Sequence, residues 1–557
     1  MSNKSKSDID KILSRMVSRR HIVSLSAGAA CAAVFGMSSN AYAAKNKKAV
    51  TKYEIVYVLN GGKQAAGQRL ILKADATYSA KKLLDPKRRG YAFTGWFADE
   101  DLVKPLELLQ GVKRASKRTA YAGWKKRKYT FTYVDNDPFD TVRTKEYTVT
   151  TATFKHEKPT RKGYAFVGWF ADAKLKTQVS NTVEKGSIGN KTLYAKWDMK
   201  DIWKTYLAEM IPKIKAKKGL AAASGESFVF LTDPHVKSNA MCSAPAIKKI
   251  MKDAKIDLFF MGGDFLNAHA TKEDALARYE LWNKEMSFAT VYCVRGNHDN
   301  NNNNGTTYPN PDVHITDDEL CQLVFPQLLG EDGMTCKETI PQETMEVPGL
   351  LPDTDYQQPA AAMEVIGQTS TIRTISVAHE ESLPAQDVEP DFEKRELCYV
   401  VDNDEAQVRH IILDTGAPDA SVVSEEQLLW MQRRILELED DWTVLVFAHQ
   451  FFCVYRFDMS GQLIMRALDA IYDQSAAAIA GVITGHSHRD LAYRSPKGYV
   501  AVSSACDAYR AIANSDIAAQ RKEGVVRQAF DIVHVNTSKR ELYFQRVGFG
   551  SDRVFSY

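Results

Sequence analysis

Five short apolar stretches of the chain each lead into a cluster of acidic, amide or imidazole side chains, and no other feature limits the fold as strongly. The stretches are continuously apolar, which is typical of strands buried on both faces of a sheet in an α/β architecture. The clusters are Asp233-Pro-His235, Gly-Gly-Asp264, Gly-Asn297-His298-Asp299, His449 and Gly-His486-Ser-His488. Because ligands of α/β sheets bind beyond the carboxyl ends of the strands, we expect the clusters to meet in one crevice.

The ordered motifs between residues 227 and 490 resemble those of the calcineurin-like metallophosphoesterases. The resemblance implies a sandwich of two mixed β-sheets flanked by helices, with two metal ions at its edge. One ion would be held by Asp233, His235, Asp264 and His488. The other would be held by Asp264, Asn297, His449 and His486. This mixture of nitrogen and oxygen ligands favours Fe, Zn or Mn over Ca or Mg.

The same resemblance implies the chemistry. A hydroxide activated at the dinuclear centre would attack phosphorus, His298 would donate a proton to the leaving oxygen, and Asp299 would orient His298. Arg295 and Arg489 flank these motifs and are the predicted substrate contacts. Purple acid phosphatases carry a metal-binding Tyr three residues after the bridging Asp, whereas this chain has Asn267 there, which disfavours an Fe(III)-tyrosinate site.

A tandem repeat precedes this region. The pattern Gly-Tyr-Ala-Phe-x-Gly-Trp-Phe-Ala-Asp occurs at 90–99 and again at 163–172, and Tyr-Ala-x-Trp closes the copies at 121–124 and 194–197. An alternating strand opens each copy, and the turn after it is Asn-Gly-Gly in the first copy but Asn-Asp-Pro in the second. Internal repetition of this kind indicates two tandem modules.

The repeated features resemble the Listeria-Bacteroides repeat, a small β-grasp-like module of bacterial surface proteins. The modules are predicted at 50–125 and 126–198. The aromatic residues that recur in the two copies are expected to form the module core rather than a ligand platform. In the first module these residues are Tyr91, Phe93, Trp96 and Trp124.

Charge divides the chain. Residues 45–200 carry 33 Lys and Arg against 15 Asp and Glu, a net +18, whereas residues 201–557 carry 34 against 52, a net −18. The basic repeats are therefore expected to bind anionic polymers of the cell envelope. They could instead be solvated spacers, or they could dock on the acidic half. The acidic half disfavours nucleic acid as a substrate, because it would repel a polyanion.

The first 44 residues resemble a twin-arginine export signal. The pair Arg19-Arg20 precedes an apolar run at 25–37, and Ala-Tyr-Ala at 41–43 offers a cleavage site. An uncut membrane anchor is the alternative. No apolar run of about 18 residues follows, so the mature chain is predicted to have no transmembrane segment and to be secreted or attached to the cell surface. In an exported protein Cys321 and Cys336 could form a disulfide.

The remaining boundaries follow from periodicity. A connecting helix is predicted at 200–220 and a metallophosphoesterase domain at 226–557, with a loop insertion at about 300–396 that is rich in Asn and Pro. The predicted function is an exported hydrolase of small phosphate mono- or diesters. Two other functions stay open, an adhesion protein that uses the domain as a scaffold and a nuclease. The intact ligand set argues against the first.

Overall fold

The structure is a computed structural model, and it describes residues 51–68, 71–74, 83–107, 116–221, 224–237, 241–266, 271–301, 313–336, 364–365, 396–416, 422–453, 456–507, 521 and 524–557. The predicted export signal at 1–44, most of the predicted insertion at 300–396 and Asn267 lie outside the described residues. No helix within the described ranges is long and apolar enough to cross a membrane.

The first repeat is a four-stranded mixed sheet in the order β2-β1-β4-β3. Its strands are β1 (Thr51–Val58), β2 (Ile71–Ala74), β3 (Tyr91–Phe97) and β4 (Ser116–Lys126). The first and last strands run parallel, with Ile55 opposite Arg118. Trp96 is buried in the core, with Phe93 and Trp124 packed against it. Tyr91 differs from the prediction, because its ring lies 3.9 Å from the guanidinium carbon of Arg88 and outside this core cluster.

The second repeat has the same strand arrangement, β6-β5-β10-β8. Its strands are β5 (Tyr129–Val134), β6 (Val142–Tyr147), β7 (Phe154–Lys155), β8 (Tyr164–Phe170), β9 (Thr182–Val183) and β10 (Lys191–Met199). Asn136 adopts a left-handed conformation and donates its side-chain amide to Ala195 O at 2.7 Å, as Asn60 donates to Ala122 O at 2.9 Å in the first repeat. An asparagine at the equivalent position thus holds the turn in each copy, although the second copy lacks the Gly-Gly that follows Asn60 in the first.

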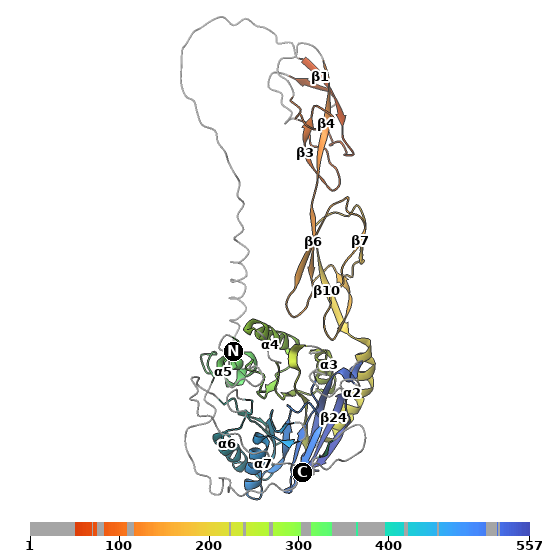
Figure 1. Cartoon of the computed structure of the whole chain (residues 1–557). Coiled ribbons are helices and arrows are strands. Elements are labelled where there is room, and N and C mark those ends of the chain that lie inside the picture. The colour runs from red at the N-terminus through yellow and green to blue at the C-terminus, as the bar shows by residue number, and fades with distance from the viewer. Residues whose placement is uncertain are drawn as a thin grey trace, which may run out of the picture. The chain divides into compact units, whose positions relative to one another are not determined.

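The rest of the chain forms an α/β domain with two sheets (Figure 1). The first sheet has the order β13-β12-β11-β23-β24-β25. Its strands are β11 (Gly225–Leu231), β12 (Leu258–Met261), β13 (Tyr292–Cys293), β23 (Ala529–Asn536), β24 (Glu541–Gly548) and β25 (Arg553–Ser556). The first three are parallel, whereas β23 to β25 are antiparallel, so the sheet is mixed.

The second sheet has the order β14-β21-β22-β20-β17-β16-β15 and is also mixed. Its strands are β14 (Glu364–Val365), β15 (Tyr399–Asn403), β16 (Val408–Ile412), β17 (Thr443–Ala448), β20 (Ala478–Thr484), β21 (Leu491–Arg494) and β22 (Val500–Ser503). A short hairpin, β18 (Phe452–Cys453) and β19 (Arg456–Phe457), follows β17. The two sheets face each other, because the rings of Phe260 in β12 and Phe447 in β17 stack with centroids 4.5 Å apart.

Helices cover the outer faces of both sheets. They are α2 (Asp201–Ala221), α3 (Ala244–Ala254), α4 (Lys272–Met286), α5 (Asp317–Val324), α6 (Glu425–Leu436) and α7 (Met459–Ile471). Helix α2 lies where the connecting helix is predicted and buries Trp203, Leu207 and Ile214 with the first sheet. Met431 of α6 and Ile464 of α7 pack with the second sheet. The prediction of two mixed sheets flanked by helices is confirmed.

The predicted disulfide is also present. Cys321 in α5 is bonded to Cys336, and their Cα atoms are 5.9 Å apart. Helix α5 begins with a capping box, in which Thr316 and Glu319 satisfy each other's backbone N–H groups. The bond and the cap together fix a helix whose first residue, Asp317, pairs with Arg295 at 2.6 Å.

Candidate metal centre

The loops after five strands bring the predicted ligands together. Asp233 and His235 follow β11, Asp264 follows β12, Asn297 follows β13, His449 follows β17, and His486 and His488 follow β20. The strands are formed by apolar residues buried between two layers, and each polar side chain comes where its strand leaves the core. These loops converge at one end of the sandwich.

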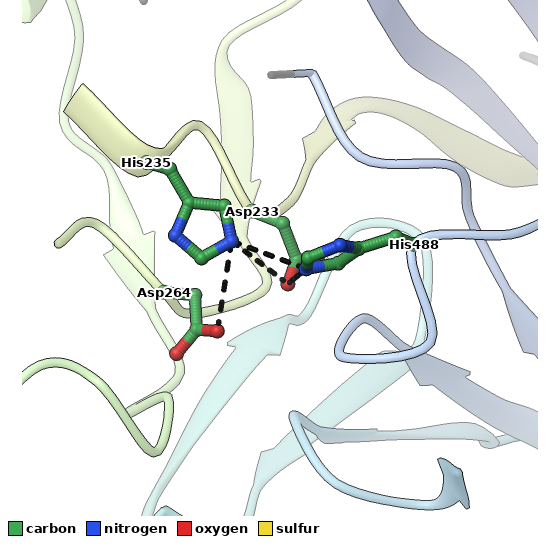
Figure 2. Close-up of side chains that lie close together, drawn as sticks. All are labelled: Asp233, His235, Asp264 and His488. Carbon is green, nitrogen blue, oxygen red and sulfur yellow. Dashed lines mark hydrogen bonds and ion pairs between the residues drawn. The ribbon is translucent and has the colours of Figure 1, made fainter. Parts of the chain in front are cut away.

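One group consists of Asp233, His235, Asp264 and His488, whose ligand atoms all lie within 4.8 Å of one another (Figure 2). The Nε2 atoms of His235 and His488 are 3.1 Å apart. His488 Nε2 lies 3.1 Å from Asp233 Oδ1, and His235 Nε2 lies 3.8 Å from Asp264 Oδ2. The two imidazoles thus aim the same nitrogen at a point bordered by two carboxylates.

A second group consists of Asp264, His449 and His486. The Nε2 atom of His449 lies 3.3 Å from Asp264 Oδ1. Asn297 joins this group, because its side-chain oxygen is 3.2 Å from His449 Nε2 and 2.9 Å from His486 Nδ1. Asp264 therefore turns one carboxylate oxygen toward each group, and it alone belongs to both.

Backbone carbonyls fix the orientation of two of the histidines. His235 Nδ1 donates to Leu266 O at 2.6 Å, and His449 Nδ1 donates to Gly262 O at 2.7 Å. Each bond leaves Nε2 as the atom that faces the centre, as in metal sites where the second ring nitrogen is held by a hydrogen bond. Asp233 Oδ1 is buried, and His488 Nε2 lies 3.1 Å from it without a well-formed hydrogen bond in the described part of the chain. A buried carboxylate oxygen that faces an imidazole nitrogen fits a cation ligand, because a cation would compensate the cost of its desolvation.

The loops approach each other too closely for larger residues. A Cβ atom on Gly296 would lie 2.1 Å from the backbone nitrogen of Asp264, and one on Gly263 would lie 2.6 Å from His449 Nδ1. Gly263 also has a φ of +94°, which side chains disfavour. These two glycines let the loops after β12, β13 and β17 meet.

The carboxylates make the centre electrostatically negative. Burial opposes a charged ring at His449, but Asp264 outweighs it and raises the pKa of His449 to about 10. Burial and the charge on His449 lower the pKa of His486 to about 4. The site thus retains one proton strongly and repels the next. Positive charge at this point is what metal ions would provide, in competition with the proton.

The sequence matches the calcineurin-like phosphoesterase family over residues 227–490. Residues 227–490 are a calcineurin-like phosphoesterase domain. The sequence also matches the Listeria-Bacteroides repeat domain over residues 53–122 and 129–196, so two such repeats precede the phosphoesterase domain. The chain therefore carries a calcineurin-like phosphoesterase domain, and the two groups that share Asp264 are candidate sites for two metal ions.

Two phosphatases are among the similar solved structures. A dimetal phosphatase from Danio rerio is 10% identical, with a TM-score of 0.37, and the match covers 60% of this chain and 99% of that one. The purple acid phosphatase PPD1 from yellow lupin (Lupinus luteus) seeds is also 10% identical, with a TM-score of 0.34 and coverage of 60% and 54%. The comparison with curated proteins gave no match.

Asp299 of the phosphoesterase domain has a different role from the predicted one. Its carboxylate accepts backbone N–H groups from Gly296 at 2.7 Å, Phe265 at 2.7 Å and Asp264 at 3.1 Å, and it makes no hydrogen bond with His298. Burial and the neighbouring Asp264 raise the pKa of Asp299 to about 7. Asp299 therefore organises two loop backbones. It does not orient the imidazole of His298.

His298 stands beside both groups. Its Nε2 atom lies 3.9 Å from Asp264 Oδ2, and its backbone N–H donates to Asp264 Oδ1 at 3.0 Å. The side chain is 14% exposed, so a substrate can reach it. Its Nδ1 atom is buried and has no hydrogen-bond partner among the described residues. The ring is placed by packing against His235, with centroids 5.7 Å apart.

Arg295 is not available to a substrate, which corrects the prediction. Its side chain is fully buried and pairs with Asp414 through two nitrogens and with Asp317 at 2.6 Å. A buried arginine with two carboxylate partners anchors the loop that carries Asn297 to α5 and to the end of β16. Arg489 is half-buried and directly follows His488, so its contact with substrate stays a prediction.

The sequence reasoning missed a sixth loop. Thr415 Oγ1 accepts the backbone N–H groups of His449 at 3.0 Å and Gln450 at 2.9 Å, and Asp414 holds Arg295. Both residues follow the apolar strand β16 in the run Leu413-Asp414-Thr415-Gly416. This is the same pattern of an apolar strand ending in Asp and Gly that identified the other loops, so the signal was present.

Proposed function

We propose that the protein hydrolyses phosphate mono- or diesters of small molecules, and that it does so outside the cytoplasm. The observation that carries the hydrolytic part is the shared carboxylate of Asp264, which faces both ligand groups. A bridging carboxylate allows two cations to lie close together because it offsets their mutual repulsion. The donor set of imidazole, amide and carboxylate supports Fe, Zn or Mn as the ions.

The residues of the centre have separate roles in the proposed reaction. When bound, two divalent ions supply Lewis acidity and a water of lowered pKa. His235 and His449 offer lone pairs in directions set by Leu266 O and Gly262 O. His298 holds a proton at Nε2, at the exposed edge of the site, and gives it to the leaving oxygen as the ester bond breaks. Asp299 keeps the two loops in register through their backbone N–H groups.

The test is a panel of metals against substrates. The protein is stripped of metal and then given Mn²⁺, Zn²⁺ or Fe²⁺ with p-nitrophenyl phosphate, bis-p-nitrophenyl phosphate or single-stranded DNA. We expect turnover of at least one of the two small esters and slow or no cleavage of DNA. A protein that binds two ions and cleaves none of the three would support the scaffold function, and preferential cleavage of DNA would support the nuclease.

The proposal of export is supported by the disulfide between Cys321 and Cys336, because such bonds persist mainly in oxidising compartments. The twin-arginine pattern at 1–44 is consistent with it. Fractionation of a bacterial host that expresses the full chain tests the point. Replacement of Arg19 and Arg20 by Lys should keep the protein in the cytoplasm, and unchanged export would contradict the twin-arginine route.

We further propose that the repeats bind anionic polymers of the cell envelope. The net charge of +18 over residues 45–200 supports this, and exposed lysines such as Lys174, Lys176 and Lys185 contribute to it. Binding of this kind weakens as salt rises, because exposed charges are screened within about 8 Å at physiological ionic strength. The mature chain should therefore bind cell walls at low salt and be released by high salt.

A matched pair of variants separates the repeats from general charge. Replacing Lys174, Lys176 and Lys185 by Gln removes three charges from the second repeat. Replacing Lys213, Lys252 and Lys539 by Gln removes three exposed charges from the α/β half. Only the first variant should bind cell walls more weakly. Equal binding by both variants and the unchanged protein would favour the spacer alternative.

A further inference from the structure

Four buried charged side chains lie next to the loop that carries His486 and His488. They alternate in sign, and each arginine bridges both carboxylates. Arg546 contacts Asp490 at 2.6 Å and Asp531 at 2.9 Å, and Arg553 contacts Asp490 at 2.6 Å and Asp531 at 2.5 Å. None of the four side chains is more than 8% exposed. We call Asp490, Asp531, Arg546 and Arg553 the C-terminal tetrad.

The tetrad joins elements that are distant in the sequence. Asp490 is two residues beyond His488, at the end of the ligand loop of the second sheet. Asp531, Arg546 and Arg553 lie on β23, β24 and β25 of the first sheet. The tetrad is therefore a charged link between the two sheets at the metal centre. Its two arginines lie outside residues 227–490, which the family comparison matches.

Hydrogen bonds connect the tetrad to the loop from a second side. Ser504 donates its hydroxyl to Asp531 at 2.6 Å, and the backbone N–H of Ala505 donates to Asp490 at 3.0 Å. The neighbouring Ser503 donates to Gly485 O at 3.1 Å and lies 2.6 Å from the hydroxyl of Ser487. The loop between Gly485 and Asp490 is thus held along its whole length.

The loop needs such support because of its backbone. His486 and His488 have φ angles of +63° and +57°, in the left-handed region that residues with a Cβ atom disfavour. Strained conformations of this kind persist only where the surrounding structure imposes them. The tetrad is the group that fixes the end of the loop nearest to His488.

We propose that Arg546 and Arg553 are positioning residues for the metal centre, which act through Asp490 to hold His488 where it can bind an ion together with Asp233 and His235. The proposal rests on the function proposed above, because it assumes that His488 is a metal ligand. Arg546 lies on β24 and Arg553 on β25, so strands that follow every proposed ligand in the sequence complete the site.

The test compares two Arg→Lys substitutions in the full mature chain. Arg553→Lys keeps the positive charge, but a single ammonium cannot bridge two carboxylates with a rigid fork. Arg409→Lys is the control, because Arg409 also pairs with a carboxylate through two nitrogens, at Asp402, and contacts Glu437, far along the chain from every metal ligand. Both substitutions are expected to lower the melting temperature, so stability alone does not separate them.

The readout is the binding of Co²⁺ to the metal-free protein, measured by calorimetry and by the visible absorption of the bound ion. Both measurements are made below the melting temperature of each variant. Loss of a group that orients a metal ligand typically weakens binding about 10- to 100-fold. Arg553→Lys should weaken one of two Co²⁺ binding events by about tenfold and change the Co²⁺ spectrum, and Arg409→Lys should do neither. Unchanged Co²⁺ affinity and spectrum in Arg553→Lys would overturn the proposal.

Two further measurements keep the outcomes distinct. If Arg553→Lys does not fold, Ser504→Ala removes only the hydrogen bond to Asp531, and it should still weaken the same binding event measurably. Full Co²⁺ affinity in that variant would then overturn the proposal. If the unchanged protein binds no Co²⁺, Mn²⁺ or Zn²⁺, the proposed dinuclear function fails, whereas two normal binding events in every variant leave that function intact and reject the positioning role alone.

Discussion

The carboxylate of Asp299 accepts the backbone N–H of Asp264 at 3.1 Å, so one acidic residue holds the backbone of another whose side chain faces both metal groups. The same carboxylate holds Gly296 and Phe265. It therefore ties the loop after β13 to the loop after β12. The two loops that carry Asp264 and Asn297 are thus held together by the side chain of Asp299, which is not itself a candidate metal ligand.

Replacement of Asp299 by Asn should destabilise the protein and weaken metal binding at the same time. The amide offers one acceptor oxygen where the carboxylate offers two, and its NH₂ group would face a backbone N–H. Leaving a buried donor without a partner costs about 1–3 kcal/mol. Urea unfolding of the metal-free protein measures the loss of stability. Unfolding at the same urea concentration as the unchanged protein would contradict the assigned role.

Replacement of Asp264 by Asn should abolish tight binding at both metal sites. The side chain belongs to both ligand groups, so the loss of its charge affects each ion. Metal analysis after desalting should find neither ion retained. His488→Ala is the matched control, because His488 belongs to one group only and its loss should spare the other ion. Two ions retained by Asp264→Asn would refute the shared-ligand assignment.

Replacement of His298 by Ala should leave the metals bound and reduce activity according to the leaving group. A proton donor matters most for a basic leaving alkoxide, where general acid catalysis is worth about 10²- to 10⁴-fold. Hydrolysis of an alkyl phosphate should fall by about this factor, and hydrolysis of a nitrophenyl ester should fall much less. Equal losses on the two esters would argue against His298 as the acid.

Acid should weaken the C-terminal tetrad. Burial alone would raise the pKa of Asp531, but Arg546 and Arg553 outweigh it and lower the pKa to about 2. A carboxyl group with a lowered folded-state pKa stabilises the protein above its ordinary pKa and loses this contribution as the pH falls toward the folded-state value. The full effect is about 2 kcal/mol, and about half should be lost by pH 3. The difference in urea stability between the unchanged protein and Asp531→Asn should therefore shrink between pH 5 and pH 3, and parallel curves would exclude this linkage.

The second repeat should be coupled energetically to the phosphoesterase domain. Arg161 donates to both carboxylate oxygens of Glu285 in α4, at 3.0 and 2.9 Å, and the Glu285 side chain is only 3% exposed. A double-mutant cycle with Arg161→Gln and Glu285→Gln should give a coupling energy of about 1–2 kcal/mol. Lys128→Gln, which breaks an exposed pair with Glu146, should change stability by less than about 0.5 kcal/mol. Additive effects of the Arg161 and Glu285 substitutions would show that the contact carries no energy.

The sandwich was predicted through the resemblance to a known family, and the grouping of the candidate ligands was predicted because each follows its own strand. Asp264 and His449 follow apolar runs directly, so their placement depends only on where β12 and β17 end. Partners far along the chain were not predictable in the same way. The hydrogen bonds between Asp299 and Phe265 and between Arg295 and Asp414 depend on how loops from different strands pack. The local sequence around each residue does not indicate which residue will be its partner.

Arg295 shows the limit most clearly. An arginine beside a phosphate-handling motif has the right charge for a substrate contact, and the sequence cannot tell an exposed guanidinium from a buried one. Its burial is decided by Asp317, which α5 presents after a capping box, and by Asp414 at the end of β16. The tetrad was missed for the same reason, since its four members come from four separate strands and loops.

The pairing of β11 with β23 sets how much of the chain must be synthesised before the first sheet can close. Ser227 in β11 lies 2.7 Å from His534 in β23, a residue 307 positions later. During synthesis the strand β11, which leads to Asp233, keeps one edge unpaired until β23 (Ala529–Asn536) has left the ribosome. A chain that stops short of β23 would therefore carry every proposed ligand, since the last is His488, and still lack the closed sheet that brings them together. Premature termination should yield an inert, aggregation-prone fragment rather than a weakly active enzyme.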